Sequence, residues 1–124
     1  MPISYSIDYE NRIVRTVWAG DVTAADVRAH WTRYLDDPVV MALRRTLSDL
    51  RTANLLFSGE ELYELIRDVV LPQLDGVGWK TAILVAEPAQ FGASRQYQVF
   101  AGIYSHDTIF HDAERALAWL VSDE

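Results

Sequence analysis

Apolar and polar residues alternate along the first two segments of the chain. Residues 3–9 carry an apolar or aromatic side chain at every second position, which is the period of a half-buried β-strand. Residues 12–18 are rich in β-branched side chains and follow after a short turn. The two segments therefore predict a β-hairpin, and Gly20 is expected to end its second strand.

Later segments show the helical spacing of apolar residues instead. The first of these begins at Thr23, whose side chain can form a capping box with Asp26, and it is expected to close at Pro38. A second helix is expected to open at Ser58. Pro72 should kink or end this second helix, because proline lacks the backbone N–H that a helix interior needs.

Strands and helices alternate through the rest of the chain. Residues 45–50, 79–86 and 108–110 predict strands, and 79–86 is the most continuous apolar run and the expected central strand. Residues 87–104 predict a third helix. A last helix, capped by Asp112, completes the chain.

The resulting order is β-β-α-β-α-β-α-β-α, which predicts an α/β fold. Its mixed sheet has parallel pairs joined by right-handed crossovers and one antiparallel N-terminal strand. The 124 residues, half of them hydrophobic, suit a single domain spanning residues 1–124. Polar residues recur within two of the strands and suggest that one face of the sheet is only partly buried: Arg15, Thr16, Thr46 and Ser48.

Composition excludes several classes of function. Without cysteine the chain has no disulfides, no thiolate catalysis and no cysteine-based metal site. A net charge of −7, with 11 basic residues outnumbered by 18 acidic ones, argues against binding to nucleic acid or to anionic membrane surfaces. No apolar run approaches the roughly 20 residues of a membrane span, and the N-terminus does not resemble a signal peptide. We therefore expect a cytoplasmic location and no membrane insertion.

Three short motifs indicate a family. They are "WAG" at the end of the second predicted strand, "LSDL" in the third, and the ending "FHDAERALAWL". Together with the order of elements they resemble a bacterial family of uncharacterised SpoIIAA-like proteins with a STAS-like fold. The resemblance implies strands laid side by side, an order that tends to put helices mainly on one face. The ending fits the family pattern F-x-D-x-x-x-A-x-x-W-L at Phe110, Asp112, Ala116, Trp119 and Leu120.

The same resemblance draws attention to Ser58. The better-known anti-sigma-factor antagonists of this fold carry a regulatory serine just before a glycine, at about the place of Ser58 and Gly59, and Asp49 resembles the acid that ends their preceding strand. Their pattern Asp-Ser-Ser-Gly-Leu is only partly kept, because the acid and the first serine are missing. Ser58 is also a good N-cap, and Glu61 can close a capping box where a phosphate would need free donors. We interpret Ser58 as a cap, and a phosphorylation switch is the alternative.

The histidines and serines allow only weak catalytic hypotheses. His106 and His111 would point to opposite faces if they flank a short strand, so no metal site is predicted, and His30 is expected at the surface. No cofactor motif and no G-x-S-x-G elbow occur. A small hydrolase would need Ser58 or Ser94 beside a histidine.

Aromatic residues in the third predicted helix provide the remaining candidates: Phe91, Tyr97, Phe100 and Tyr104. They either pack into the core or line a groove or interface. The leading hypothesis is a non-enzymatic binding or regulatory module that acts through protein contacts, as a homodimer or with another protein. The second is a carrier of a small apolar, lipid-like ligand, with a cavity beside residues 91–104. The third is the hydrolase.

Overall fold

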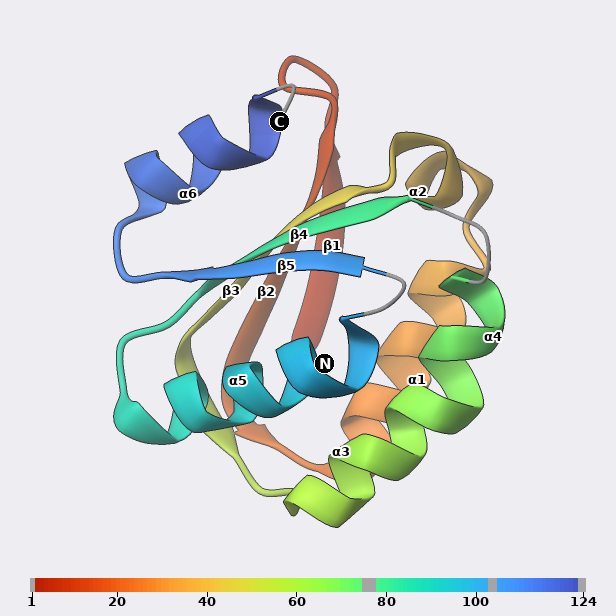
Figure 1. Cartoon of the computed structure of the whole chain (residues 1–124), viewed down its shortest axis with the longest axis vertical. Coiled ribbons are helices and arrows are strands. Elements are labelled where there is room, and N and C mark those ends of the chain that lie inside the picture. The colour runs from red at the N-terminus through yellow and green to blue at the C-terminus, as the bar shows by residue number, and fades with distance from the viewer. Residues whose placement is uncertain (1, 75–77, 103–104, 123–124) are drawn as a thin grey trace.

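A mixed five-stranded β-sheet forms the centre of the molecule (Figure 1). The computed structural model describes residues 2–74, 78–102 and 105–122. The strands lie side by side in chain order, and the first pair is antiparallel while all other pairs are parallel, which confirms the predicted sheet. The strands are β1 (Ile3–Asp8), β2 (Ile13–Val22), β3 (Arg45–Leu55), β4 (Trp79–Leu84) and β5 (Ser105–Phe110).

Helices cover the two faces of the sheet unequally. Most of the buried apolar residues form one core between the sheet and α1, α3, η1, α4 and α5. A smaller core lies on the opposite face, where α6 packs over β3, β4 and β5, apart from the other helices (Figure 1). The helices are α1 (Ala24–Leu35), α2 (Pro38–Leu43), α3 (Gly59–Leu65), the π-helical η1 (Ile66–Val70), α4 (Leu71–Leu74), α5 (Pro88–Ala101) and α6 (Ala113–Val121).

Side-chain caps fix the starts of two helices where the sequence predicted them. The Thr23 side chain accepts a hydrogen bond from the Asp26 backbone N–H (3.2 Å), and the Thr23 N–H donates to the Asp26 carboxylate (2.9 Å). Asp112 accepts hydrogen bonds from the N–H groups of Glu114 and Arg115. Both caps satisfy backbone donors that the first turn of a helix leaves free.

Three strands, β2, β3 and β5, are longer than predicted. β2 continues through Gly20 to Val22, because it stays paired with β3 as far as Leu55. Gly20 has a φ of +68°, a conformation that glycine adopts without the steric cost of a side chain. The prediction that Gly20 ends the strand is therefore wrong.

The order of the strands also corrects the expected centre of the sheet. β4 has all six residues buried, as its apolar sequence predicted, but β3 occupies the middle position and β4 lies between β3 and β5. β4 is buried because both of its faces are covered: Trp79 and Ile83 belong to the larger core, and Ala82 belongs to the smaller core under α6.

Neither Pro38, expected to close a helix, nor Pro72, expected to kink or end one, lies at the C-terminal end of a helix. α1 ends at Leu35, and Pro38 begins the unpredicted α2, with Asp37 as its N-cap. Proline suits a first helical turn because its missing N–H has no intrahelical partner there. Pro72 does not end its helix, which continues to Leu74 after the π-helical η1.

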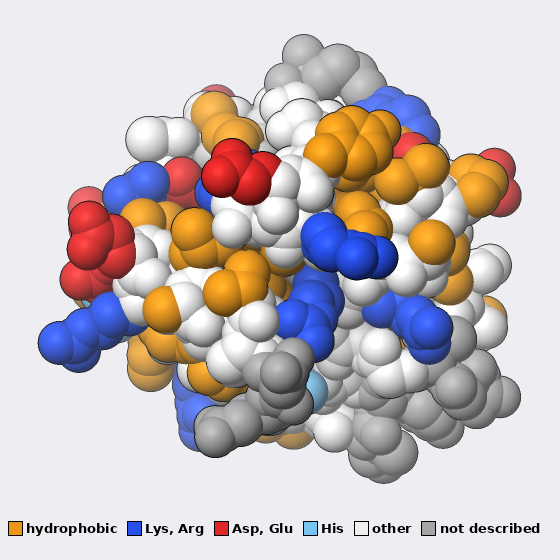
Figure 2. All heavy atoms as spheres, turned by 90° about the horizontal axis from the view of Figure 1, so that it is seen from above, with side chains coloured by type: hydrophobic (Ala, Val, Ile, Leu, Met, Phe, Trp, Pro, Cys, Tyr) orange, Lys and Arg blue, Asp and Glu red, His pale blue; other side chains and the backbone are white. Residues whose placement is uncertain are grey.

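The surface mixes charges of both signs. Acidic, basic and hydrophobic side chains are interspersed on the side seen from above (Figure 2). The excess of acidic residues does not form a single field on that side. No helix within the described ranges is long and apolar enough to cross a membrane.

Candidate functional site

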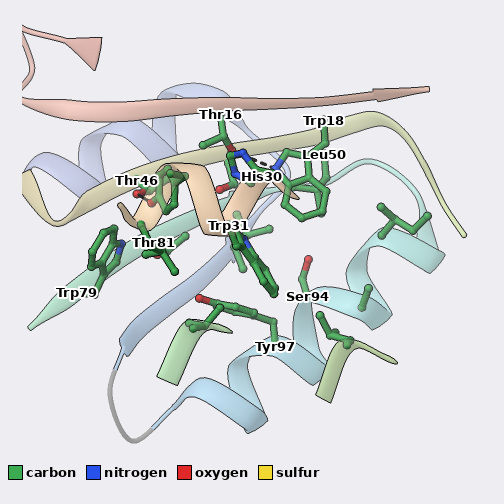
Figure 3. A pocket seen from close by; sticks show the side chains of 18 of the residues that line it. Thr16, Trp18, His30, Trp31, Thr46, Leu50, Trp79, Thr81, Ser94 and Tyr97 are labelled. Atoms are coloured by element: carbon green, nitrogen blue, oxygen red, sulfur yellow. Dashed lines mark hydrogen bonds between the residues drawn. The ribbon is translucent and has the colours of Figure 1, made fainter. Parts of the chain in front are cut away.

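A cavity of about 80 Å³ lies between the sheet and the helices of the larger core. Side chains from β2, β3 and β4 form one side of its wall, and side chains from α1, the α3–α4 region and α5 form the other (Figure 3). Among the described residues, the wall contains no Asp, Glu, Lys or Arg. The cavity is therefore largely apolar and strongly aromatic, with a wall that includes Trp18, Trp31, Tyr34, Trp79 and Tyr97.

His30 brings an imidazole into this wall from α1. The residue is only 2% exposed, and its ring stacks on Tyr34 (5.2 Å between ring centroids) and meets the rings of Trp18 (5.9 Å) and Tyr5 (6.1 Å) edge-on. Its Nδ1 atom is buried and has no hydrogen-bond partner in the described part of the chain. Burial, with a smaller effect of the nearby Arg33, lowers the pKa of His30 from 6.5 to about 4. The imidazole is therefore neutral at physiological pH.

The expectation that His30 lies at the surface is wrong. His30 follows Val27 by three residues and precedes Tyr34 by four, so it belongs to the buried stripe of α1. That spacing was visible in the sequence. The spacing predicts a buried position, whereas the residue type alone favours a partly exposed one.

A row of polar side chains crosses the sheet beneath the helices. Thr46, Thr81 and Asp107 are register partners on β3, β4 and β5, so their side chains share one face. The Thr46 hydroxyl is hydrogen-bonded to the hydroxyl of Tyr34. Thr46 and Thr16 are both 2% exposed, so their interpretation as marks of a partly buried face is wrong. They are among the polar groups of the cavity wall.

Asp107 lies next to the wall without belonging to it. One carboxylate oxygen, Oδ1, accepts a hydrogen bond from the Ser105 hydroxyl (2.6 Å), while Oδ2 is buried without a partner among the described residues. Burial raises the pKa of Asp107 from 3.8 to about 6, although hydrogen bonds from Ser105 and Thr81 act in the opposite direction. This burial depends on how α5 covers β5, which no local sequence pattern contains.

Gln90 fixes the position of α5 against the sheet. Its side-chain oxygen accepts hydrogen bonds from the N–H groups of Ala86 (2.8 Å) and Glu87 (3.0 Å). Its amide nitrogen donates to the main-chain carbonyls of Arg51 (3.2 Å) and Ala53 (2.9 Å) in β3. One buried side chain thus joins the end of β3, the residues after β4 and the first turn of α5.

Ser58 lies outside the cavity wall, at the start of α3. Its hydroxyl accepts a hydrogen bond from the Glu61 N–H (3.1 Å), and its own N–H donates to the Glu61 carboxylate (2.9 Å). The interpretation of Ser58 as a cap is therefore confirmed. A phosphorylation switch at this position stays a prediction.

The aromatic candidates of α5 occupy different surroundings. Tyr97 lines the cavity and packs on Trp31, with 5.9 Å between ring centroids (Figure 3). Phe100 is not part of the wall and meets the Tyr63 ring edge-on at 5.2 Å. Tyr104 lies outside the described residues. The structure thus brings Tyr97, and not Phe100, into the candidate site.

The fourth aromatic candidate, Phe91, is exposed and stacks on His111, also outside the wall. His106 is exposed as well and lies edge-on against Trp119. Within the described ranges no group of three or more His, Asp or Glu side chains is placed to hold a metal ion. Both histidines are therefore surface residues.

The serines of the hydrolase hypothesis are engaged elsewhere. Ser94 lines the cavity, but its hydroxyl donates to the main-chain carbonyl of Gln90 (2.8 Å). Across the described parts of the chain, neither Ser58 nor Ser94 is hydrogen-bonded to a histidine. Neither of these two serines is therefore placed for activation by a histidine of the described segments.

Comparison with known proteins adds information on the fold. No family model matches the sequence, and no curated protein matches it. The structure is similar to that of an uncharacterised protein of the DUF3478 family from Shewanella loihica PV-4, described as having a SpoIIAA-like fold. The TM-score is 0.63 at 16% sequence identity, and the match covers 95% of this chain and 93% of the other. The resemblance expected from the sequence is thus confirmed at the level of architecture, and the chain has a SpoIIAA-like α/β fold.

Proposed function

We propose that this protein is a non-enzymatic binding module that holds a small, largely apolar molecule in the cavity between its sheet and α1, α3 and α5. The observation that carries the proposal is the cavity itself, whose wall is aromatic and free of Asp, Glu, Lys and Arg among the described residues. Apolar and aromatic walls with few polar groups are typical of small-molecule sites. This develops the ligand-carrier hypothesis, which required a cavity beside α5.

The volume of the cavity limits the size of the ligand. About 80 Å³ is roughly half of the ~150 Å³ of an engineered cavity that binds benzene. It is far below the ~300–1,000 Å³ of pockets for drug-sized ligands. The proposed ligand is therefore a compact molecule. A long-chain lipid would fit only if the residues of the wall moved.

A variant that fills the cavity tests this function. Ala93 lines the cavity on α5, whereas Ala89 is exposed on the same helix. We expect Ala93→Leu to abolish binding of a small apolar probe, 1-chlorobutane, and Ala89→Leu to leave it unchanged. Indole N–H signals in ¹⁵N NMR spectra report the binding, because Trp18, Trp31 and Trp79 line the cavity and Trp119 does not. Equal binding by both variants, or equal shifts of all four indoles, would contradict the proposal.

Contact with another protein, including a second copy of this chain, is the second candidate function. It is favoured by apolar side chains that α3 and α5 leave exposed, among them Tyr63 (46%) and Val99 (73%). Such side chains are common at interfaces. Sedimentation velocity of the wild type and of Val99→Glu tests this. A dimer that the variant weakens supports the candidate, and a monomer at all concentrations removes self-association.

A further inference from the structure

We infer that the ligand of the cavity is uncharged and carries a hydroxyl group that hydrogen-bonds to Nδ1 of His30. This inference rests on the proposed function and specifies its ligand. It assigns the chemical class from Nδ1 of His30, which is, among the described residues that line the cavity, the one buried side-chain polar atom without a hydrogen-bond partner.

The buried Nδ1 atom is the starting point. A polar atom buried without a hydrogen bond costs about 1–3 kcal/mol, so such atoms are rare in native proteins unless a ligand or water satisfies them. His30 is 2% exposed and lines the cavity (Figure 3). Its ring packs against the rings of Tyr34 and Trp18. The surrounding rings hold the imidazole in place, so its free nitrogen is a fixed feature of the wall.

Several other polar groups of the wall already have hydrogen-bond partners within the protein. The Trp18 indole N–H donates to the Thr16 hydroxyl (3.2 Å). The Tyr34 hydroxyl is hydrogen-bonded to Thr46, and the Ser94 hydroxyl donates to a main-chain carbonyl. A ligand that enters the cavity therefore gains most from a polar group placed at His30.

The absence of charged side chains from the described wall disfavours charged ligands. An anion would have no Lys or Arg beside it in the described wall, and the imidazole is neutral. The nearby carboxylate of Asp107 would repel an anion further once it is ionised. A cation would find no carboxylate in the wall itself. Burying an unpaired charge is strongly unfavourable, so the ligand is uncharged.

A hydroxyl group suits this nitrogen better than other small polar groups. In a neutral imidazole one ring nitrogen donates and the other accepts, and the structure does not distinguish the two tautomers. A hydroxyl can donate and accept, so it satisfies Nδ1 in either tautomer. The apolar part of the ligand then contacts the aromatic side chains of the wall. The class is therefore a small alcohol.

A titration followed by ¹⁵N NMR tests the inference, with butan-1-ol, 1-chlorobutane and butanoate as probes and with the wild type and His30→Phe. We expect butan-1-ol to shift the indole signals of Trp18, Trp31 and Trp79 and the Nδ1 signal of His30. The Trp119 indole and the rings of His106 and His111 are internal controls. His30→Phe should weaken butan-1-ol binding about tenfold, which corresponds to one lost hydrogen bond, and leave 1-chlorobutane within twofold. Butanoate should bind at least tenfold more weakly than butan-1-ol.

The possible results separate this inference from the proposed function. If His30→Phe weakens both neutral probes equally, if butanoate binds best, or if butan-1-ol leaves Nδ1 unchanged, the inference is wrong although the cavity still binds ligands. If no probe shifts the three cavity indoles more than Trp119, both the inference and the proposed function are wrong. Should His30→Phe fail to fold, the response of Nδ1 in the wild type decides.

Discussion

The imidazole of His30 lies stacked on the phenol ring of Tyr34, with 5.2 Å between the ring centroids and 30° between the planes. The Tyr34 hydroxyl is in turn hydrogen-bonded to Thr46 of β3. The position of the imidazole is therefore fixed jointly by α1 and the sheet. A binding group fixed in this way loses little conformational freedom when a ligand arrives, which favours binding.

Opposite effects of pH are predicted for His30 and Asp107. The pKa of His30 is lowered to about 4, so this residue contributes stability above its usual pKa of 6.5 that is lost as the pH falls toward 4. The pKa of Asp107 is raised to about 6, so this residue contributes stability below its usual 3.8 that is lost as the pH rises through 6. Each contribution is about 3 kcal/mol, and the two nearly cancel between pH 4 and 6.

Removing one of the two titrating groups should make visible the effect of the other on how stability depends on pH. In Asp107→Asn we expect the free energy of unfolding to fall by about 3 kcal/mol more than in the wild type when the pH is lowered from 6.5 to 4. In His30→Phe the free energy of unfolding should instead fall as the pH rises from 4 to 6.5. Urea denaturation at a series of pH values measures this, with the exposed Asp36→Asn as a control for the lost charge. Parallel profiles for all variants would refute the assignment.

The loss of Gln90 should loosen α5. Gln90→Ala removes four hydrogen bonds and leaves main-chain groups of β3 and of the β4–α5 connection unsatisfied. We expect the free energy of unfolding to fall by about 2–4 kcal/mol, measured by urea denaturation. Gln96→Ala, an exposed position on the same helix, is the matched control and should change it by less than about 0.5 kcal/mol. Equal effects of both substitutions would count against the role of Gln90.

At the start of α3, Ser58→Ala should lower the free energy of unfolding by about 1 kcal/mol, because the capping box with Glu61 is lost. Ser58→Asp should retain most of the stability, since Asp is also a good N-cap. Thermal denaturation compares these variants with the exposed Ser4→Ala. A stable Ser58→Ala protein would show that the cap is unimportant. Phosphoserine found at Ser58 in protein from native cells would favour the switch.

The only lysine of the chain supports α6 from the sheet. Lys80 is buried, and its Nζ donates to the main-chain carbonyls of Trp119 (2.6 Å) and Ser122 (3.1 Å). Lys80→Met should lower the free energy of unfolding by about 2–3 kcal/mol and speed amide exchange in α6. Arg95→Met, on the exposed side of α5, is the control. Unchanged exchange in α6 would contradict this account.

Local patterns predicted the fold well. Alternation in residues 3–9, the capping boxes at Thr23 and Ser58, and the cap at Asp112 each depend on a few neighbouring residues, so a single sequence reveals them. Ends of elements were harder to predict, because the pairing of β2 with β3 carries the strand through Gly20. Pairing across strands is a long-range effect that local patterns do not contain.

The candidate site could be predicted only in part. Tyr97 belonged to a recognised aromatic stripe and does line the cavity. His30, Gln90 and Asp107 were missed because their environments are created by layers that meet only in the folded chain. A cavity depends on gaps of a few ångströms between those layers, and hydrophobic spacing does not determine such gaps.

A crystal structure of the protein soaked in butan-1-ol tests the central claim most directly. The account predicts electron density for one alcohol molecule inside the cavity, with its oxygen about 2.7–3.2 Å from Nδ1 of His30 and its carbon chain against Trp31 and Tyr97. A cavity that stays empty or holds only water after soaking would contradict the account.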